Sequence, residues 1–143
     1  MNELNRLKKD IYSLLKENDI DKKDKDGWTL LHKFCRDNVD SELILLLLNH
    51  GANINEKDIY GLTPLHVVCN SDDINKELIC LLLENGADIN CVTNNGASLL
   101  HLVCSNGMNK DIIELLLNKG ININISNCNH ENVLYLICNG FDP

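Results

Sequence analysis

A single short pattern recurs along this 143-residue chain at a nearly constant interval. Each copy begins at a glycine, carries a hydroxyl residue two positions later and ends on a histidine. The copies occupy residues 27–32, 61–66 and 96–101, and a degenerate fourth copy begins at residue 130, so the starting positions lie 34, 35 and 34 residues apart. Self-similarity at such a period is typical of stacked units that each bury an apolar face on the next. We therefore predict a linear array, which favours binding of another macromolecule over catalysis.

The second half of each unit also repeats. Apolar runs cover residues 43–48, 78–83 and 112–117, and each is followed by a glycine and a short stretch rich in Asn and Asp. We expect two helices per unit, the first capped by a hydroxyl such as that of Thr29 or Thr63. The glycine supplies the left-handed residue that ends the second helix. Asn and Asp then suit the tight turn into the next unit.

These features resemble the ankyrin repeat, a unit of roughly 33 residues with a turn, two helices and a Thr-Pro-Leu-His signature. Residues 63–66 match the signature in full, whereas Leu30 and Leu99 replace its proline and Ser98 replaces its threonine. Each unit is slightly longer than the family norm, with the extra residues between its two helices. The resemblance covers essentially the whole chain. It implies an all-α solenoid of stacked helix-turn-helix units with short β-turn hairpins between them.

The organisation that follows is a single ankyrin-repeat domain over residues 1–143. It divides into a capping half-repeat, three full repeats and a partial repeat, at residues 1–26, 27–60, 61–95, 96–129 and 130–143. The first segment has apolar residues at helical spacing among many lysines, which suits a cap with one wet face. The last segment lacks a second helix. Two explanations stay open: a fragment of a longer protein, which we favour, or a short form whose exposed end meets a partner.

Net charge and hydropathy limit the classes of molecule that this protein is expected to bind. The net charge is −8, and residues 1–27 carry seven acidic and seven basic side chains, so the surplus belongs to the repeats. An acidic array repels phosphates, and we expect neither nucleic acid nor a membrane surface as a partner. No apolar run has the length of a membrane span, and the N-terminus lacks the apolar region of a secretion signal. We expect a monomeric, cytoplasmic protein that binds another protein and takes no small-molecule substrate.

The seven cysteines invite a redox or metal interpretation, which the repeat register disfavours. Cys35, Cys69, Cys104 and Cys138 hold the same position in successive units. Packed helices lie roughly 8–10 Å apart, whereas a disulfide needs Cα atoms within about 7 Å. We therefore expect these cysteines to be free thiols that pack as small apolar residues. Unpaired thiols are also typical of a reducing compartment.

The motif histidines do not form a site of their own. His32, His66 and His101 each precede a cysteine by three residues, but one such pair per unit cannot converge on a zinc ion. In the ankyrin family this histidine ties adjacent turns together by hydrogen bonds. The chain also has no phosphate-binding loop, nucleophile elbow or His-Glu-x-x-His pair. We predict no enzyme activity, no catalytic residue, no metal and no cofactor.

The resemblance places the partner site on the concave side, where turn tips and the exposed edges of first helices meet. The partner-binding candidates at these positions are Trp28, Arg36, Ile59, Tyr60, Leu62 and Asn95. Trp, Tyr and Arg are enriched among interface hot spots, and clustered exposed apolar groups mark docking sites. We take Trp28, Arg36, Tyr60 and Leu62 as the centre. The alternative is that Trp28 and Tyr60 fold back to cover neighbouring turns.

The composition suggests two biological settings. The sequence is rich in Asn, Ile and Lys and has Cys in place of Ala, and in this composition it resembles ankyrin arrays of poxviruses, intracellular bacteria or protists. Such arrays often capture a host protein, in the host-cell cytoplasm or nucleus. The alternative is a structural scaffold or an adaptor fragment, such as the substrate-recruiting part of a ubiquitin-ligase adaptor. The family also undergoes asparagine hydroxylation in the turn, and Asn90 matches that context best.

Overall fold

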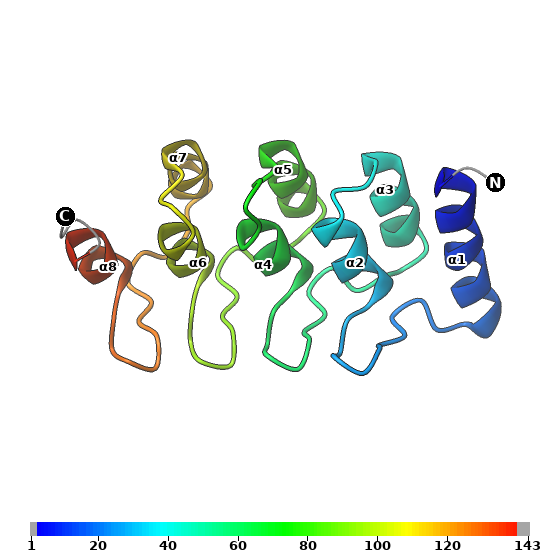
Figure 1. Ribbon diagram of the computed structural model, residues 1–143, viewed down its shortest axis with the longest axis horizontal. Coiled ribbons are helices and arrows are strands. Elements are labelled where there is room, and N and C mark those ends of the chain that lie inside the picture. Colours follow the sequence, from blue (N-terminus) through cyan, green and yellow to red (C-terminus); the bar gives the residue numbers. More distant parts are fainter. Residues whose placement is uncertain (1–2, 140–143) are drawn as a thin grey trace.

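The computed structural model describes residues 3–139, and within that range the secondary structure consists of eight α-helices and no strand (Figure 1). The helices are α1 (Glu3–Glu17), α2 (Leu30–Arg36), α3 (Ser41–Asn49), α4 (Pro64–Cys69), α5 (Lys76–Glu84), α6 (Leu99–Ser105), α7 (Lys110–Asn118) and α8 (Val133–Asn139). Two isolated antiparallel bridges, Val92 with Ser98 and Ser126 with Asn132, are the only β-type pairings described. The all-α solenoid expected from the repeats is confirmed.

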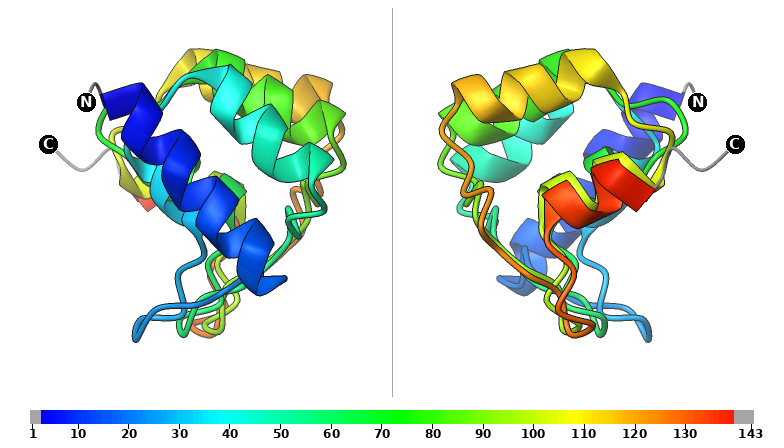
Figure 2. Two further views of the ribbon diagram at one scale, coloured as in Figure 1. Left: turned by 90° about the vertical axis from the view of Figure 1, so that its right-hand side faces the viewer. Right: turned by 90° about the vertical axis from the view of Figure 1, so that its left-hand side faces the viewer.

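The helices stack in two layers along one axis. The inner helices α2, α4, α6 and α8 contact one another in that order, and each of α3, α5 and α7 packs on the inner helix of its own unit. Helix α1 packs against α3 at the N-terminal end. Viewed along the stack, the connecting hairpins superimpose and project from one edge of the helical layers (Figure 2). The array therefore presents a row of equivalent tips rather than a single central cleft.

Hydroxyl and histidine side chains together start the inner helices. The Thr29 hydroxyl accepts a hydrogen bond from the His32 amide at 3.5 Å, and the Thr29 amide donates to Nδ1 of His32 at 3.2 Å. Thr63 and His66 repeat the arrangement at 3.4 and 3.2 Å. This reciprocal pairing satisfies amides that the first turn leaves without a helical partner. It confirms the capping role predicted for both threonines.

The outer helices have a different pair of ends. The residue before each of these helices accepts a hydrogen bond from a backbone amide of the first turn through its side chain. These residues are Asp40, Asn75 and Asn109. Each outer helix is followed by a glycine with positive φ, at 90° for Gly51, 94° for Gly86 and 81° for Gly120. This left-handed conformation is costly for residues with a side-chain Cβ and routine for glycine. The predicted glycine stops are confirmed.

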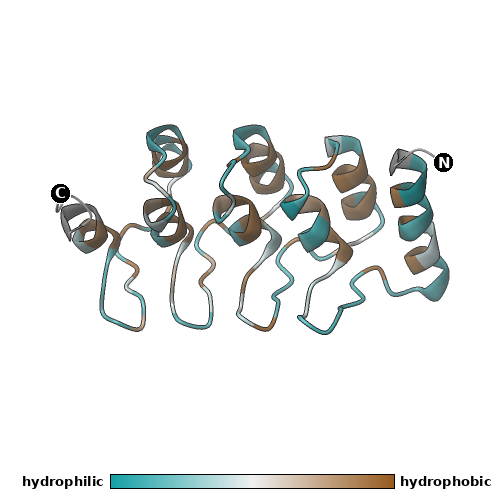
Figure 3. Cartoon of the chain, in the orientation of Figure 1, coloured by the Kyte–Doolittle hydropathy of each residue, from teal (hydrophilic) through white to brown (hydrophobic). Residues whose placement is uncertain are grey.

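Aliphatic side chains fill the space between the layers. Leu47, Leu82 and Leu116 hold the same position in α3, α5 and α7, and all three are fully buried. Figure 3 shows apolar residues on the facing sides of the helices, whereas much of α1 is hydrophilic. Apart from Phe34, the largest fully buried side chains are all leucine or isoleucine, so aliphatic residues supply most of the apolar area removed from water. Within residues 3–139, no helix combines the length and hydropathy that crossing a membrane requires.

Candidate partner-binding surface

The row of tips is built from four similarly closed turns. We call residues 24–28, 58–62, 93–97 and 127–131 tips 1 to 4. In each tip the first residue donates its amide to the carbonyl of the last, as from Asp58 to Leu62 at 2.9 Å. Neighbouring tips are also joined, for example by the Asn94 amide and the Tyr60 carbonyl at 2.9 Å. A Cβ added to Gly61 would lie 2.6 Å from the Asn94 nitrogen, so only glycine permits this approach.

Asp58 organises tip 2 and links it to tip 1. Its Oδ1 accepts the amides of Tyr60 and Leu62, both at 2.8 Å. Its Oδ2 accepts the indole N–H of Trp28 at 3.0 Å. Asp58 is only 7% exposed, and a buried carboxylate with three donors is well satisfied. The sequence-based choice of site residues missed Asp58, although Asp24, Thr93 and Asn127 hold the same first position in the other tips.

Trp28 and Arg36 meet on the edge of α2. The Arg36 guanidinium lies 5.3 Å from the centre of the Trp28 ring, within cation–π range. Arg36 also donates to Asp37, with 2.7 Å between Nε and Oδ1. Trp28 is half-buried, and its bond to Asp58 is the fold-back contact that the self-packing alternative expects. Part of the Trp28 side chain nevertheless stays accessible beside the exposed Arg36.

Tip 2 carries the most exposed apolar side chains of this surface. Tyr60 is 65% exposed and Ile59 is 52% exposed, although both belong to a hydrogen-bonded tip. Within residues 3–139 the Tyr60 hydroxyl has no hydrogen-bond partner. Tyr60 therefore does not show the fold-back that Trp28 shows. Both side chains are therefore accessible to solvent on this surface.

A groove lies between tips 2 and 3 and has a volume of about 330 Å³. It is lined by Tyr60, Leu62 and Asn95, three of the residues chosen from the sequence, and by Leu102 on α6. Ile59 does not line the groove but lies beside it, where its carbonyl accepts the Asn94 side-chain amide at 2.9 Å. The candidates thus form two clusters, Trp28 with Arg36 and Tyr60 with Leu62 and Asn95. Leu102 was missed because its groove exists only between neighbouring units.

The motif histidines are structural. Nε2 of His32 lies 3.0 Å from the Leu62 carbonyl of the next unit, and Nε2 of His101 lies 2.9 Å from that of Glu131. Since Nδ1 of His32 accepts the Thr29 amide, Nε2 carries the proton and donates to the carbonyl. Burial lowers the pKa of His32, and burial with the nearby Lys57 charge lowers the pKa of His66 to about 4. The imidazoles of His32 and His101 thus tie adjacent units together.

The buried thiols are poor nucleophiles. Burial raises the pKa of Cys35 and of Cys69 to about 12, which suppresses the reactive thiolate. Cys91 lies with its sulfur 3.5 Å from Nδ1 of His66, and burial raises its pKa too. All the cysteines with described side chains are free thiols; the side chain of Cys138 lies outside the described part. Among the described side chains, which exclude that of Cys138, no three His, Cys, Asp or Glu residues are grouped to hold a metal ion.

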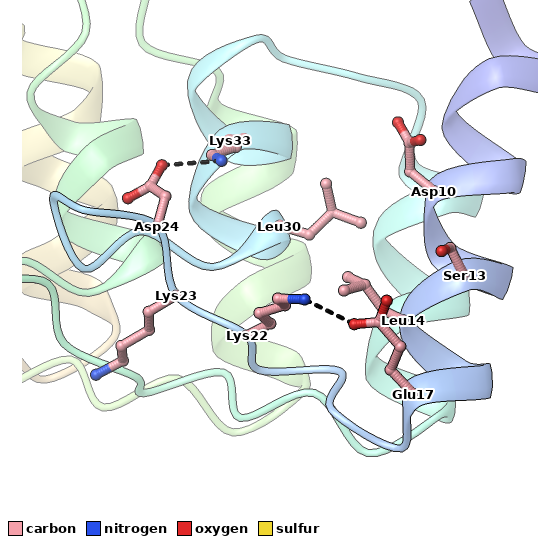
Figure 4. A pocket seen from close by; sticks show the side chains of 9 residues that line it. All are labelled: Asp10, Ser13, Leu14, Glu17, Lys22, Lys23, Asp24, Leu30 and Lys33. Carbon is pink, nitrogen blue, oxygen red and sulfur yellow. Dashed lines mark hydrogen bonds and ion pairs between the residues drawn. The ribbon is translucent and has the colours of Figure 1, made fainter.

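A second hollow, of about 500 Å³, lies between α1 and α2 and is drawn in Figure 4. Its charged side chains neutralise one another, with Lys22 Nζ 2.7 Å from Glu17 and Lys33 Nζ 2.8 Å from Asp24. Lys23 pairs instead with Glu56 of the following unit, at 2.6 Å. The hollow therefore offers no concentrated charge for a ligand.

Asn90 lies on the exposed turn after α5. Its Oδ1 accepts the Asn122 amide of the next unit at 2.8 Å. Asn55 holds the same position one unit earlier and accepts the Asp88 amide at 2.8 Å. Both side chains therefore link consecutive turns, and both residues are exposed.

Comparison with known proteins agrees with this architecture. The family model described as "Ankyrin repeats (3 copies)" matches residues 4–93 and, in a second match, residues 69–142. The chain is 43% identical over 68 residues to "SMC5-SMC6 complex localization factor protein 1" of Homo sapiens, and 41% identical over 68 residues to the protein of that name from Mus musculus. Each of these alignments covers 48% of this chain but only 6% of the relative.

Proposed function

This chain belongs to the ankyrin-repeat family, a non-enzymatic class of protein–protein interaction modules, and from that premise we propose where its partner binds. The proposed surface comprises the tips and the α2 edge, with contacts from Trp28, Arg36, Ile59, Tyr60, Leu62 and Asn95. The observation that carries the proposal is the 65% exposure of Tyr60 on a tip whose backbone is held by hydrogen bonds. An amphipathic ring on a rigid support gains contact area at little entropic cost.

Removal of the aromatic side chains tests this surface. We expect the double substitution Trp28→Ala and Tyr60→Ala to reduce capture of the partner from a cell lysate by more than about tenfold, or roughly 1.4 kcal/mol. Immobilised protein and quantitative mass spectrometry of the bound fraction provide the measurement. Tyr60→Ala alone should account for much of the loss, because the ring is 65% exposed on tip 2. The substitution should leave the fold intact, because the Tyr60 hydroxyl has no hydrogen-bond partner among the described residues.

Tyr12→Ala is the matched control, since Tyr12 is a 53% exposed tyrosine on α1, away from the tips. It should leave capture unchanged. Circular dichroism must show equal helix content in every variant, because Trp28→Ala also removes the bond to Asp58. Unchanged capture by a folded double variant would contradict the proposed surface.

The proposed partner is a protein, bound by a monomer that carries out no chemistry of its own. The net charge of −8 supports this choice, because it disfavours binding of phosphate-rich nucleic acid or anionic lipid. Our first proposal for the setting is a pathogen protein that captures a host factor in the host cytoplasm or nucleus. It rests on the resemblance of the composition to such arrays.

A second candidate setting is an adaptor or scaffold within a larger protein. The chain aligns with only 6% of the length of the relatives, so in them a similar stretch of repeats is a small part of a large protein. The name of these relatives describes a factor that localises a complex. The identity of the captured protein distinguishes the settings. A foreign host protein supports the first, whereas a constituent of the same complex, or of a ubiquitin-ligase assembly, supports the second.

Asn90 is the proposed hydroxylation site. Its exposure and its place in the turn between α5 and α6 support access by a hydroxylase. After exposure to an asparagine hydroxylase, mass spectrometry should show the mass of one added oxygen on the peptide containing Asn90. Asn55 is the internal comparison, because it has the same position and the same kind of turn-to-turn bond. Modification of Asn55 alone would contradict the assignment.

A further inference from the structure

No formally charged side chain lines the groove between tips 2 and 3, although the buried carboxylate of Asp58 lies next to it and is occupied by the amides of Tyr60 and Leu62, both at 2.8 Å. Residues 59–71 and 89–109 contain no Asp, Glu, Lys or Arg, although such residues make up 24% of the chain. These two segments supply α4, α6, the whole of tip 3 and most of tip 2. The excess negative charge of the protein therefore lies elsewhere. A charged group entering the groove would lose hydration and find no counter-ion in these segments.

The groove combines apolar side chains with two side-chain donors that have no partner within the described residues, the Tyr60 hydroxyl and the Asn95 amide nitrogen. Tyr60, Leu62 and Leu102 line it, together with Thr93 and Ala97, which are 8% exposed each. The Thr93 hydroxyl donates to Oδ1 of Asn95. Within the described residues, the Asn95 side-chain nitrogen has no hydrogen-bond partner, and Asn95 is exposed. A ligand that fills the groove without an acceptor would leave this donor unsatisfied.

This pairing specifies the chemistry of the occupant. A volume of about 330 Å³ is small for a ligand pocket and suits one or two apolar side chains. The acceptor that accompanies such side chains in a protein is a backbone carbonyl. In a helix that carbonyl is used within the helix, whereas an extended segment presents it outward. An extended segment therefore satisfies both requirements at once.

We propose that the groove binds an extended, uncharged peptide segment of the partner protein. One apolar side chain of the segment enters between Tyr60, Leu62 and Leu102, and a backbone carbonyl accepts a hydrogen bond from Asn95. The inference rests on the proposed function and deepens it, because it names the chemical class of the partner at one part of the same surface.

A display library of random 12-residue peptides provides the probe. Selection on the immobilised protein should enrich peptides with an apolar anchor and no charge next to it. The affinity of a synthesised peptide, measured by fluorescence anisotropy, should change less than twofold between 0.05 and 0.5 M NaCl, because no ion pair forms. Leu102→Lys should weaken binding more than tenfold. The fold tolerates lysine there, because Lys33 occupies the equivalent position of α2.

Two further variants sharpen the result. Asn95→Asp keeps the shape of the side chain but replaces the donor with a carboxylate, and should weaken binding at least fivefold. Leu117→Lys places the same substitution on the exposed side of α7 and should bind normally. Enrichment of charged, salt-sensitive peptides, equal binding to Leu102→Lys, or no enrichment at all overturns the inference. Lysate capture separates the proposals: loss in Tyr60→Ala with normal capture by Leu102→Lys rejects the groove alone, and normal capture by both rejects the proposed surface.

Discussion

Substitution of Leu82 by alanine is expected to destabilise the protein by about 3 kcal/mol or more, because it leaves a cavity where a fully buried leucine stood. Leu82 is 0% exposed in the second half of α5, in the middle unit of the array. In a solenoid each unit is stabilised mainly by its immediate neighbours, so a defect in the middle weakens both halves. Chemical denaturation followed by circular dichroism should show a lower midpoint. The unfolding transition should also broaden or divide in two.

Leu117→Ala is the matched control. Leu117 lies on α7 and is 48% exposed, so its truncation removes little buried area and should cost less than about 1 kcal/mol. Since a protein of this size is stable by only about 5–15 kcal/mol, the two variants should be readily separated. Equal destabilisation by Leu82→Ala and Leu117→Ala would contradict the layered core described above.

Acidification from pH 7 to pH 4 is expected to lower the free energy of unfolding by about 3 kcal/mol through His66 alone. Burial and the nearby Lys57 charge lower the pKa of His66 to about 4, whereas an unfolded histidine titrates near 6.5. Between these values the unfolded chain binds a proton that the folded protein does not. The contribution of His66 is therefore complete above pH 6.5 and is lost as the pH falls toward 4. Burial lowers the pKa of His32 as well, so His32 acts in the same direction.

The geometry explains why the folded protein resists this proton. Nδ1 of His66 accepts the Thr63 amide at 3.2 Å, so protonation would set two hydrogens against each other. Carboxylates act at lower pH: the hydrogen bond from Lys33 holds the pKa of Asp24 at about 2, and the bond from Lys23 lowers the pKa of Glu56 below its ordinary value of 4.5. The interval from pH 6.5 to 4 therefore belongs mainly to the buried histidines.

Urea denaturation at several pH values between 7 and 4 measures this dependence. His66→Gln should flatten the slope of unfolding free energy against pH, whatever its effect on stability at pH 7. His50→Gln, at an exposed histidine, is the matched control. The comparison between the variants also removes the general effect of reducing the net charge of −8, which is common to both. An unchanged slope in His66→Gln would show that His66 is not kept neutral by the fold.

Much of the fold could be predicted from local signals. Thr29 and Thr63 mark the starts of inner helices, and Gly51 and Gly86 mark the ends of outer ones. These signals can be found in the sequence because capping depends on atoms only a few residues apart. The apolar run at 78–83 lies within α5, as expected from the repeat pattern. The candidate site was predictable only as a set of positions, since the resemblance says where partners dock and not how side chains pair.

The side-chain contacts between units could not be predicted from the sequence. Trp28 and Asp58 lie 30 residues apart, yet a 3.0 Å hydrogen bond joins them. Cys91 and His66 are 25 residues apart and come within 3.5 Å. No spacing rule marks either pair, because each depends on the angle and distance at which one unit docks on the next. The prediction for Trp28 accordingly left packing and docking open, and the structure shows a half-buried ring.

The sequence by itself determined the repeat, the helix ends and the excess negative charge, because each of these is written in residue type and spacing along the chain. Only the tertiary structure decided that Asp58 would clamp Trp28, and that Tyr60, Leu62 and Leu102 would enclose a groove with the free amide of Asn95. The physical reason is that hydrogen bonds and apolar contacts act over a few ångströms. Residues from different units come within that range only after the units have stacked.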